Sequence, residues 1–157
     1  LKAFNDKFYQ KICGQSLPTI LQSLEIIKAE KKHLEIVNLI VPSYNDDLEV
    51  IKKMCQWVKK NLGQDTPLHF GRFHAEYKLK DLPDTPVKTV EQARQIAFDE
   101  GLKHVYTFNV APHEGNNTYC PACKNLAVQR IGYTVTQNNI ISGKCQYCGN
   151  KIPGRWK

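Results

Sequence analysis

The pattern of apolar and polar residues changes period repeatedly along the first two thirds of the chain. Residues 34–41 are almost continuously apolar, which is typical of a strand buried on both faces. Residues 67–73 and 104–109 predict two further strands, and the segment from Leu1 to Phe4 predicts the end of an earlier one. The chain therefore starts, in this interpretation, inside an α/β pattern.

Helical spacing fills the stretches between these strands. Asn5 or Asp6 is expected to cap a short helix that ends before Gly14, and Pro18 opens a second helix. Asn45 is expected to cap a third helix that Gly63 ends, and a capping box at residues 89–92 starts a fourth that runs to Gly101. The inward stripe of the third helix is predicted to be Leu48, Ile51, Cys55, Val58 and Leu62.

Strands that alternate with helices indicate a parallel sheet with right-handed crossovers. The elements amount to about half of a (β/α) barrel, or to part of an open doubly wound sheet. We expect this α/β region to span residues 1–112 and a small cysteine module to span 113–157. The chain begins at Leu1 and its only methionine is Met54, so we expect a fragment or processed product that lacks earlier β/α units.

Four cysteines near the end carry the clearest chemical signal. They form two C-x-x-C pairs, Cys120/Cys123 and Cys145/Cys148, with 21 residues between the pairs. Two such turns supply four thiolates to one ion, a set that suits zinc or a single iron. The alternatives are two disulfides or a redox-active pair. Disulfides need an oxidising compartment, and no signal peptide is visible.

Charge separates the tail from the rest of the chain. The formal net charge is +7, yet residues 119–157 hold six basic residues and no acidic ones. A basic tail suggests nucleic acid, but a four-thiolate zinc site would lower its charge to about +4. We therefore favour scattered surface lysines over nucleic-acid binding. No apolar run is long enough for a membrane span, and the cytoplasm is the expected location.

Polar residues follow each predicted strand, where the ligand sites of parallel α/β folds gather. They are Lys2, Ser43, Asn45, Asp46, Arg72, His74, Asn109, His113 and Glu114. His74 is the best candidate for a ligand contact, although helix capping and solvent exposure explain several of the others. Cys13 and Cys55 are expected to be buried small apolar residues. We find no phosphate-binding glycine loop and no pair of catalytic carboxylates.

Several segments together resemble one enzyme family. They are LKAFND (1–6), VNLIVPSYNDD (37–47), HFGRFH (69–74), HEGNNTYCPAC (113–123) and GKCQYCGNKIPGRW (143–156). Their order and spacing resemble the radical S-adenosylmethionine (SAM) enzyme of the AmmeMemoRadiSam system, a relative of pyruvate formate-lyase activating enzyme. The resemblance covers essentially the whole chain.

The resemblance implies a partial barrel that binds SAM and a [4Fe-4S] cluster, whose reductive cleavage of SAM gives a 5′-deoxyadenosyl radical for hydrogen abstraction. Lys2 matches the lysine of an Asp-x-Lys motif, and His74 matches a histidine near the ribose. Val41, at the end of the apolar strand, would wall the adenine. Arg72 and Phe73 depart from the family's Pro-Tyr before that histidine, so only His74 carries over.

The largest departure is that no C-x-x-x-C-x-x-C cluster motif occurs in this chain. We therefore expect the C-terminal half of such an enzyme, inactive alone, whose partners are the missing N-terminal half and a protein substrate or proteins of the AMMECR or Memo type. The catalytic residues remain unknown from this chain. The alternative is a stand-alone zinc-ribbon module that contacts nucleic acid or protein through its basic tail.

Overall fold

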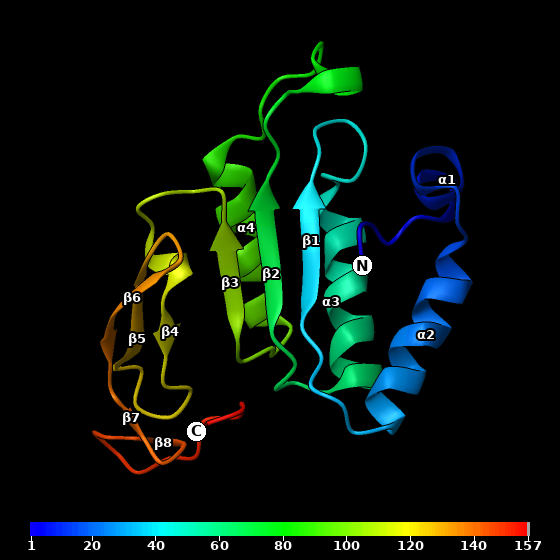
Figure 1. Ribbon diagram of the computed structural model, residues 1–157. Coiled ribbons are helices and arrows are strands. Elements are labelled where there is room, and N and C mark those ends of the chain that lie inside the picture. Colours follow the sequence, from blue (N-terminus) through cyan, green and yellow to red (C-terminus); the bar gives the residue numbers. More distant parts are fainter. Residues whose placement is uncertain (157) are drawn as a thin grey trace.

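A three-stranded parallel sheet forms the centre of the first part of the protein. A computed structural model describes residues 1–156 (Figure 1). The strands β1 (Ile36–Ile40), β2 (Leu68–Arg72) and β3 (Val105–Phe108) lie side by side in chain order. Ile36 aligns with Leu68, and Leu68 aligns with Val105. The predicted mixed α/β class with a parallel sheet is confirmed.

Helices cover one face of this sheet. They are α3 (Leu48–Leu62) and α4 (Val87–Asp99). Beside them lie α1 (Asp6–Phe8), which continues as the π-helical turn η1 (Tyr9–Cys13), and α2 (Leu17–Ala29). Figure 1 shows α3 and α4 behind the sheet, and α2 packs on α3. Ile36, Phe70 and Val58 meet in the core between sheet and helices, each at most 1% exposed. The apolar stripe predicted for α3 faces this core, with Met54 added to it.

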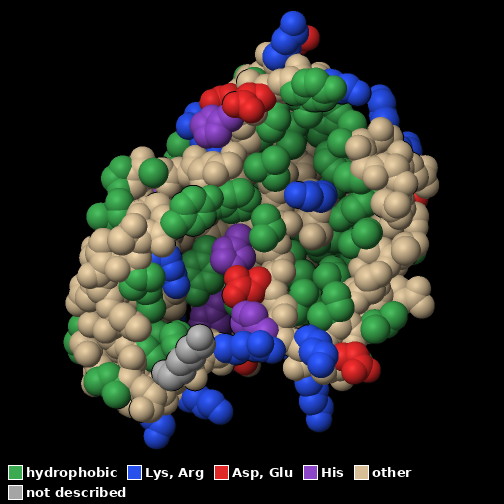
Figure 2. Space-filling model, in the orientation of Figure 1, with side chains coloured by type: hydrophobic (Ala, Val, Ile, Leu, Met, Phe, Trp, Pro, Cys, Tyr) green, Lys and Arg blue, Asp and Glu red, His purple; other side chains and the backbone are tan. Residues whose placement is uncertain are grey.

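The opposite face of the sheet has no helix on it. Because side chains alternate along a strand, this face carries Val37, His69, Tyr106 and Phe108. Val37 is 42% exposed, whereas its neighbour Ile36 is 1% exposed. Figure 2, drawn from the same side, shows this face as a hollow in which apolar and histidine side chains gather.

Several local predictions were wrong. Residues 1–4 form no strand, although the Leu1 amino group donates to the Val37 carbonyl at 3.3 Å. Asp47, rather than Asn45, caps α3, because its carboxylate accepts from the amides of Glu49 and Val50.

Two further differences concern α4 and Cys13. Helix α4 begins at Val87, two residues before the predicted capping box, because the Thr85 hydroxyl is engaged with β1 and β2 and the chain turns into the helix at Pro86. Cys13 is exposed, since the short π-helical turn points it outward, while Cys55 is buried as expected.

The tail is built from short antiparallel strands. The strands β4 (Thr118–Tyr119), β5 (Leu126–Ile131) and β6 (Thr134–Asn138) form one sheet, and β7 (Ile140–Ile141) pairs with β8 (Lys144–Cys145). Two single-turn 3₁₀ helices, η2 (Tyr77–Leu79) and η3 (Glu114–Asn116), lie in the loops before α4 and β4. Within residues 1–156, no helix combines the length and the apolar character needed to span a bilayer.

Polar contacts join the tail to the sheet. The Tyr106 ring stacks on His69, with 4.9 Å between ring centroids, and its hydroxyl lies 3.1 Å from that of Thr118. The guanidinium carbon of Arg130 lies 5.8 Å from the centroid of the Tyr106 ring, and Arg130 donates to the hydroxyl of Thr118. One of the six basic residues of the tail therefore has a structural role.

Candidate metal centre and ligand site

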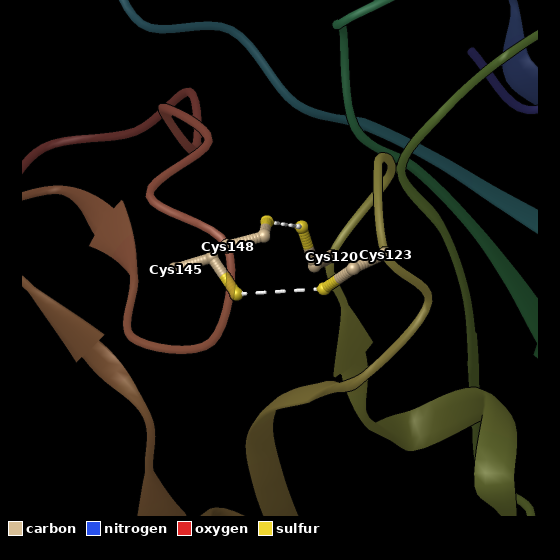
Figure 3. Close-up of side chains that lie close together, drawn as sticks. All are labelled: Cys120, Cys123, Cys145 and Cys148. Atoms are coloured by element: carbon tan, nitrogen blue, oxygen red, sulfur yellow. Dashed lines mark hydrogen bonds between the residues drawn. The ribbon is translucent and has the colours of Figure 1, made fainter.

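The four tail cysteines come together from two loops, as the spacing predicted. Cys120 and Cys123 face Cys145 and Cys148 across a small gap (Figure 3). The sulfur of Cys120 lies 3.6 Å from that of Cys148, and the sulfur of Cys123 lies 3.7 Å from that of Cys145. All four sulfur atoms lie within 4.8 Å of one another.

These distances bear on two of the alternatives that the sequence left open, a disulfide and a metal site. A disulfide requires about 2.05 Å between sulfurs, so all six cysteines are free thiols here. A tetrahedral ion with sulfur ligands at about 2.3 Å has sulfur–sulfur edges of about 3.8 Å. The cross-loop distances match that edge, so the donor set fits a four-thiolate metal ion.

Each cysteine pair lies on a knuckle of the same construction. In the first, the amide of Cys120 donates to the carbonyl of Asn125, and the amide of Lys124 donates back to Cys120, both at 2.9 Å. In the second, Cys145 pairs with Asn150 in the same way, and the amide of Gly149 donates to Cys145 at 2.8 Å. The sequence analysis missed this repeat, although C-x-x-C-x-Asn is present at both places.

The knuckles need left-handed backbone at corresponding positions. Gly149 has a φ of 73°, as expected for the glycine after the second pair, and Lys124 has a φ of 62°. The knuckles thus aim both sulfurs of each pair at one point. Around them Cys120, Cys145 and Ile152 form a buried apolar cluster, which is small for a module of this length.

The electrostatics of the thiols also favour a cation. The backbone amide of Asn125 lowers the pKa of Cys123 to about 7. The backbone amide of Asn150 acts in the same direction on Cys148, but the nearby Cys123, Cys120 and Cys145 outweigh it and raise the pKa of Cys148 to about 12. One thiolate therefore forms near neutral pH, whereas four adjacent thiolates need a divalent ion to hold them together.

A second group of polar residues lies at the carboxyl end of the sheet. Lys2 and Val41, both predicted to contact a cofactor, are joined there by Asn45. The side-chain amide of Asn45 donates to the carbonyl of Lys2 at 2.7 Å, and its oxygen accepts from the amide of Val41 at 2.6 Å. Asn38, also buried, donates to the same Lys2 carbonyl at 3.0 Å. Lys2 itself is exposed and Val41 is buried.

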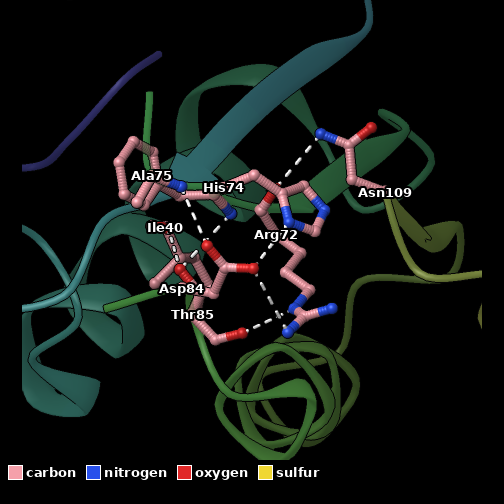
Figure 4. Close-up of polar contacts among 8 residues, drawn as sticks. Ile40, Arg72, His74, Ala75, Asp84, Thr85 and Asn109 are labelled. Atoms are coloured by element: carbon pink, nitrogen blue, oxygen red, sulfur yellow. Dashed lines mark hydrogen bonds and ion pairs between the residues drawn. The ribbon is translucent and has the colours of Figure 1, made fainter. Parts of the chain in front are cut away.

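His74 stands at the end of β2, where it was predicted, and is held by a residue that the sequence analysis did not single out. Its Nδ1 lies 2.8 Å from a carboxylate oxygen of Asp84, as Figure 4 shows. The other oxygen of Asp84 accepts from the amide of Ala75 at 2.8 Å. These contacts, that of Ala75 first, hold the pKa of Asp84 below its usual value. The imidazole is thus oriented, and its Nε2 makes no hydrogen bond to another group in residues 1–156.

Thr85 fixes the loop that carries Asp84. Its hydroxyl donates to the carbonyl of Ile40 at 2.6 Å, and its own carbonyl accepts from Nε of Arg72 at 2.8 Å. Asn109 closes the same edge by donating to the carbonyl of Arg72 at 3.1 Å (Figure 4). The ends of β1, β2 and β3 are therefore tied into one rim.

The remaining candidates lie elsewhere or make no side-chain hydrogen bond within residues 1–156. His113 contacts Glu91 and Glu114 contacts Arg94, at 3.1 and 3.2 Å, so both engage helix α4 at the junction with the tail. Ser43 is exposed with a φ of 64°, and Asp46 is half-buried. Neither belongs to the rim as a hydrogen-bonding partner.

Comparison with known proteins finds a longer relative but indicates no function. No family model matches the chain. The chain is 43% identical over 150 residues to Uncharacterized protein MJ0808 of Methanocaldococcus jannaschii. The matched residues cover 94% of this chain but 45% of that protein, so the chain spans a little under half of the length of this relative.

Proposed function

We propose that this chain is the C-terminal part of a radical SAM enzyme, and that its four cysteines hold a structural zinc or iron ion. The observation that carries the first part is the one-sided parallel sheet. Strand order follows chain order and the helices lie on one face, as in a segment of a (β/α) barrel. The open face would then line the barrel interior, against the remainder of a longer protein like the relative.

The rim at the carboxyl end of the sheet supports a cofactor site in that position. When bound, SAM and a [4Fe-4S] cluster on the other half would supply the reductive cleavage and the hydrogen-abstracting radical. In this chain, Val41 would offer an apolar wall for the adenine. His74, oriented by Asp84, would hold a ribose hydroxyl with its free Nε2. Asn45 would keep the backbone of Lys2 beside that wall.

The test uses the reading frame upstream of Leu1 and the intact parent protein. A C-x-x-x-C-x-x-C motif should lie within about 150 residues, or one domain length, upstream. The anaerobically reconstituted parent should form 5′-deoxyadenosine from SAM with dithionite, and the chain alone should not. His74→Ala should raise the KM for SAM about tenfold, as for one lost hydrogen bond to a ligand. His33→Ala, remote from the rim, is the matched control. A parent without the motif, or one that leaves SAM intact, would contradict the proposal.

The rival function is a ribbon that binds nucleic acid or protein through its basic face. Lys124, Lys144, Lys151 and Arg155 are exposed on the tail, and Tyr147 beside them is 51% exposed. The rival predicts binding to single-stranded RNA that weakens steeply as salt rises. If the chain does not bind the RNA even at low salt, this nucleic-acid function is excluded, and the radical SAM proposal is unaffected.

A further inference from the structure

The four thiols of the metal centre differ in their access to solvent. Cys120 and Cys145 are 0% and 2% exposed, and Cys123 is half-buried. Cys148 is exposed, so one sulfur of the centre can be reached by a dissolved reagent. Because the oxidation of cysteines follows their thiolate character and their exposure, this difference selects Cys148 as the site of modification.

The two knuckles also differ in the hydrogen bonds that their second sulfur accepts. In each knuckle, the backbone amide of the asparagine two residues later donates to that sulfur, at Cys123 and at Cys148. The side-chain amide of Asn125 adds a second bond to Cys123, at 3.5 Å. The side-chain amide of Asn150 donates instead to the carbonyl of Lys151, at 3.0 Å. Because hydrogen bonds draw electron density from a ligating sulfur, Cys148 keeps the more nucleophilic sulfur of the two.

We propose that Cys148 is the site at which a peroxide oxidises the metal centre, and that Cys120 supplies the sulfur that forms a disulfide with it. The inference rests on the proposed metal site and is independent of the radical SAM assignment. The sulfur of Cys120 lies 3.6 Å from that of Cys148, on the other knuckle. A disulfide has about 2.05 Å between sulfurs, so the two must approach by about 1.5 Å.

The reaction consumes one hydrogen peroxide and two thiolates. The thiolate of Cys148 attacks one oxygen of the peroxide, the O–O bond breaks, and the sulfur becomes a sulfenic acid while hydroxide leaves. The thiolate of Cys120 then attacks this sulfur, the S–O bond breaks, and a second hydroxide leaves as the disulfide forms. Two electrons pass from sulfur to oxygen, and two protons from solvent convert the hydroxides to water. Only Cys123 and Cys145 are then left as thiolates, too few to hold a tetrahedral ion.

Loss of the ion reaches the sheet through β4. Thr118 precedes Cys120 by two residues, and its hydroxyl lies 3.1 Å from that of Tyr106. The apolar cluster around Ile152 is too small to hold this segment without the ion. Oxidation therefore releases the tail from the sheet, and a thiol reductant with zinc restores the contact.

The test treats the zinc-loaded chain with hydrogen peroxide. A chromogenic chelator measures the release of zinc, and mass spectrometry with dimedone, which traps sulfenic acids, identifies the oxidised sulfur. Among the four thiols of the centre, the first dimedone adduct is expected at Cys148. Without dimedone, the expected product is the disulfide between Cys120 and Cys148.

The contrary outcomes are distinct. A first adduct at another thiol of the centre, or a different disulfide within it, would overturn the proposal. A loaded chain that keeps its zinc in excess peroxide would overturn it as well, while leaving the metal site in place. A chain that binds no zinc before the treatment would overturn the metal site and this inference together.

Two histidine variants compare the matching positions of the knuckles. Imidazole is also a zinc ligand, so Cys148→His and Cys123→His should each retain one equivalent of zinc. In peroxide, Cys148→His should release zinc several-fold more slowly than the parent, whereas Cys123→His should release it at least as fast as the parent. Equal rates in the two variants would refute the role of Cys148. If either variant binds no zinc, the adduct mapping on the parent decides alone.

Discussion

The side chain of Asn45 donates a 2.7 Å hydrogen bond to the carbonyl of Lys2, 43 positions earlier in the chain. It also donates to the carbonyl of Leu39 and accepts from the amide of Val41. One buried side chain thereby fixes the N-terminal segment against the end of β1. Three backbone groups depend on it, and two of them belong to residues that we assign to the cofactor site.

Asn45→Ala should lower the free energy of unfolding by about 3 kcal/mol, because it leaves buried backbone groups without partners. Urea denaturation followed by circular dichroism measures the change. Asn61→Ala, which removes one bond to the carbonyl of Trp57 within α3, should lower it by less than about 1 kcal/mol. If the free energy of unfolding falls equally in the two variants, Asn45 does not hold the three backbone groups as described.

Cys145→Ser should release one equivalent of metal and unfold the tail after about residue 119, because the tail has too small an apolar cluster to fold without the ion. Zinc analysis and NMR spectra would show metal loss, with signals of the α/β region retained. Cys13→Ser, at an exposed thiol, should keep both metal and fold. A tail that stays folded without metal would refute the knuckle assignment.

Metal binding should weaken as the pH falls, because zinc must displace protons from the thiols, and below about pH 7 the thiolate of Cys123 is protonated as well. The apparent dissociation constant for zinc, measured by competition with a chromogenic chelator between pH 5.5 and 8, should rise steadily toward low pH. An affinity independent of pH over this range would show that the thiols are not the ligands.

Glu35 should make a separate, acid-sensitive contribution to the free energy of unfolding. Hydrogen bonds from His69 and then His33 lower the pKa of Glu35 to about 2, below its usual value of 4.5, in spite of partial burial. Because the pKa of Glu35 is lower in the folded protein than in the unfolded chain, its ionised carboxylate stabilises the fold above pH 4.5. This stabilisation disappears as the pH falls from 4.5 to about 2.

The measurement is the free energy of unfolding of Glu35→Gln and the parent between pH 2 and 6. The difference between them should shrink toward the acid end, and because metal loss affects both proteins alike, the difference isolates Glu35. Glu25→Gln, on the exposed surface of α2, serves as the control. Parallel curves for Glu35→Gln and the parent would disprove this role.

Gly71→Ala should destabilise the sheet, since an added Cβ would lie 2.0 Å from Cζ of Phe108. The ring of Phe108 covers Gly71 on the open face, and displacing it should cost about 2 kcal/mol, or a fall in melting temperature of about 6 °C. The double variant Gly71→Ala/Phe108→Ala should show coupling, with less loss than the sum of the single variants. If the losses in the two single variants simply add up in the double variant, the ring of Phe108 does not lie over Gly71.

Features that depend on neighbouring sequence could be predicted from the chain. Apolar runs located β1, β2 and β3, and Gly14 and Gly63 ended their helices as expected. The four cysteines came together because each C-x-x-C pair forms a local turn, and a turn needs only the residues between its cysteines.

Features that depend on partners far away in the sequence could not be predicted from the chain. Asn45, Asp46 and Asp47 are all plausible caps, but the side-chain oxygen of Asn45 accepts from the amide of Val41, and its NH₂ group is held by the distant carbonyl of Lys2. In the sequence, Asp84 is one residue of a proline-rich loop. In the fold, the hydrogen bond of Thr85 to Ile40 holds that loop so that Asp84 contacts His74. Nothing near His104 in the sequence indicates that its buried Nε2 would find no hydrogen-bond partner within residues 1–156.

The two knuckles close on themselves through their own backbone bonds, and this has a consequence for the hairpin between them. From Ile131 to Thr136 its side chains are exposed, including the whole of Tyr133. Neither knuckle relies on that tip for its geometry, so the tip can accept inserted or exchanged residues while the ion site stays intact. The hairpin is therefore the place where related chains can diverge in length, and where a label or affinity tag can be grafted without disturbing either half of the molecule.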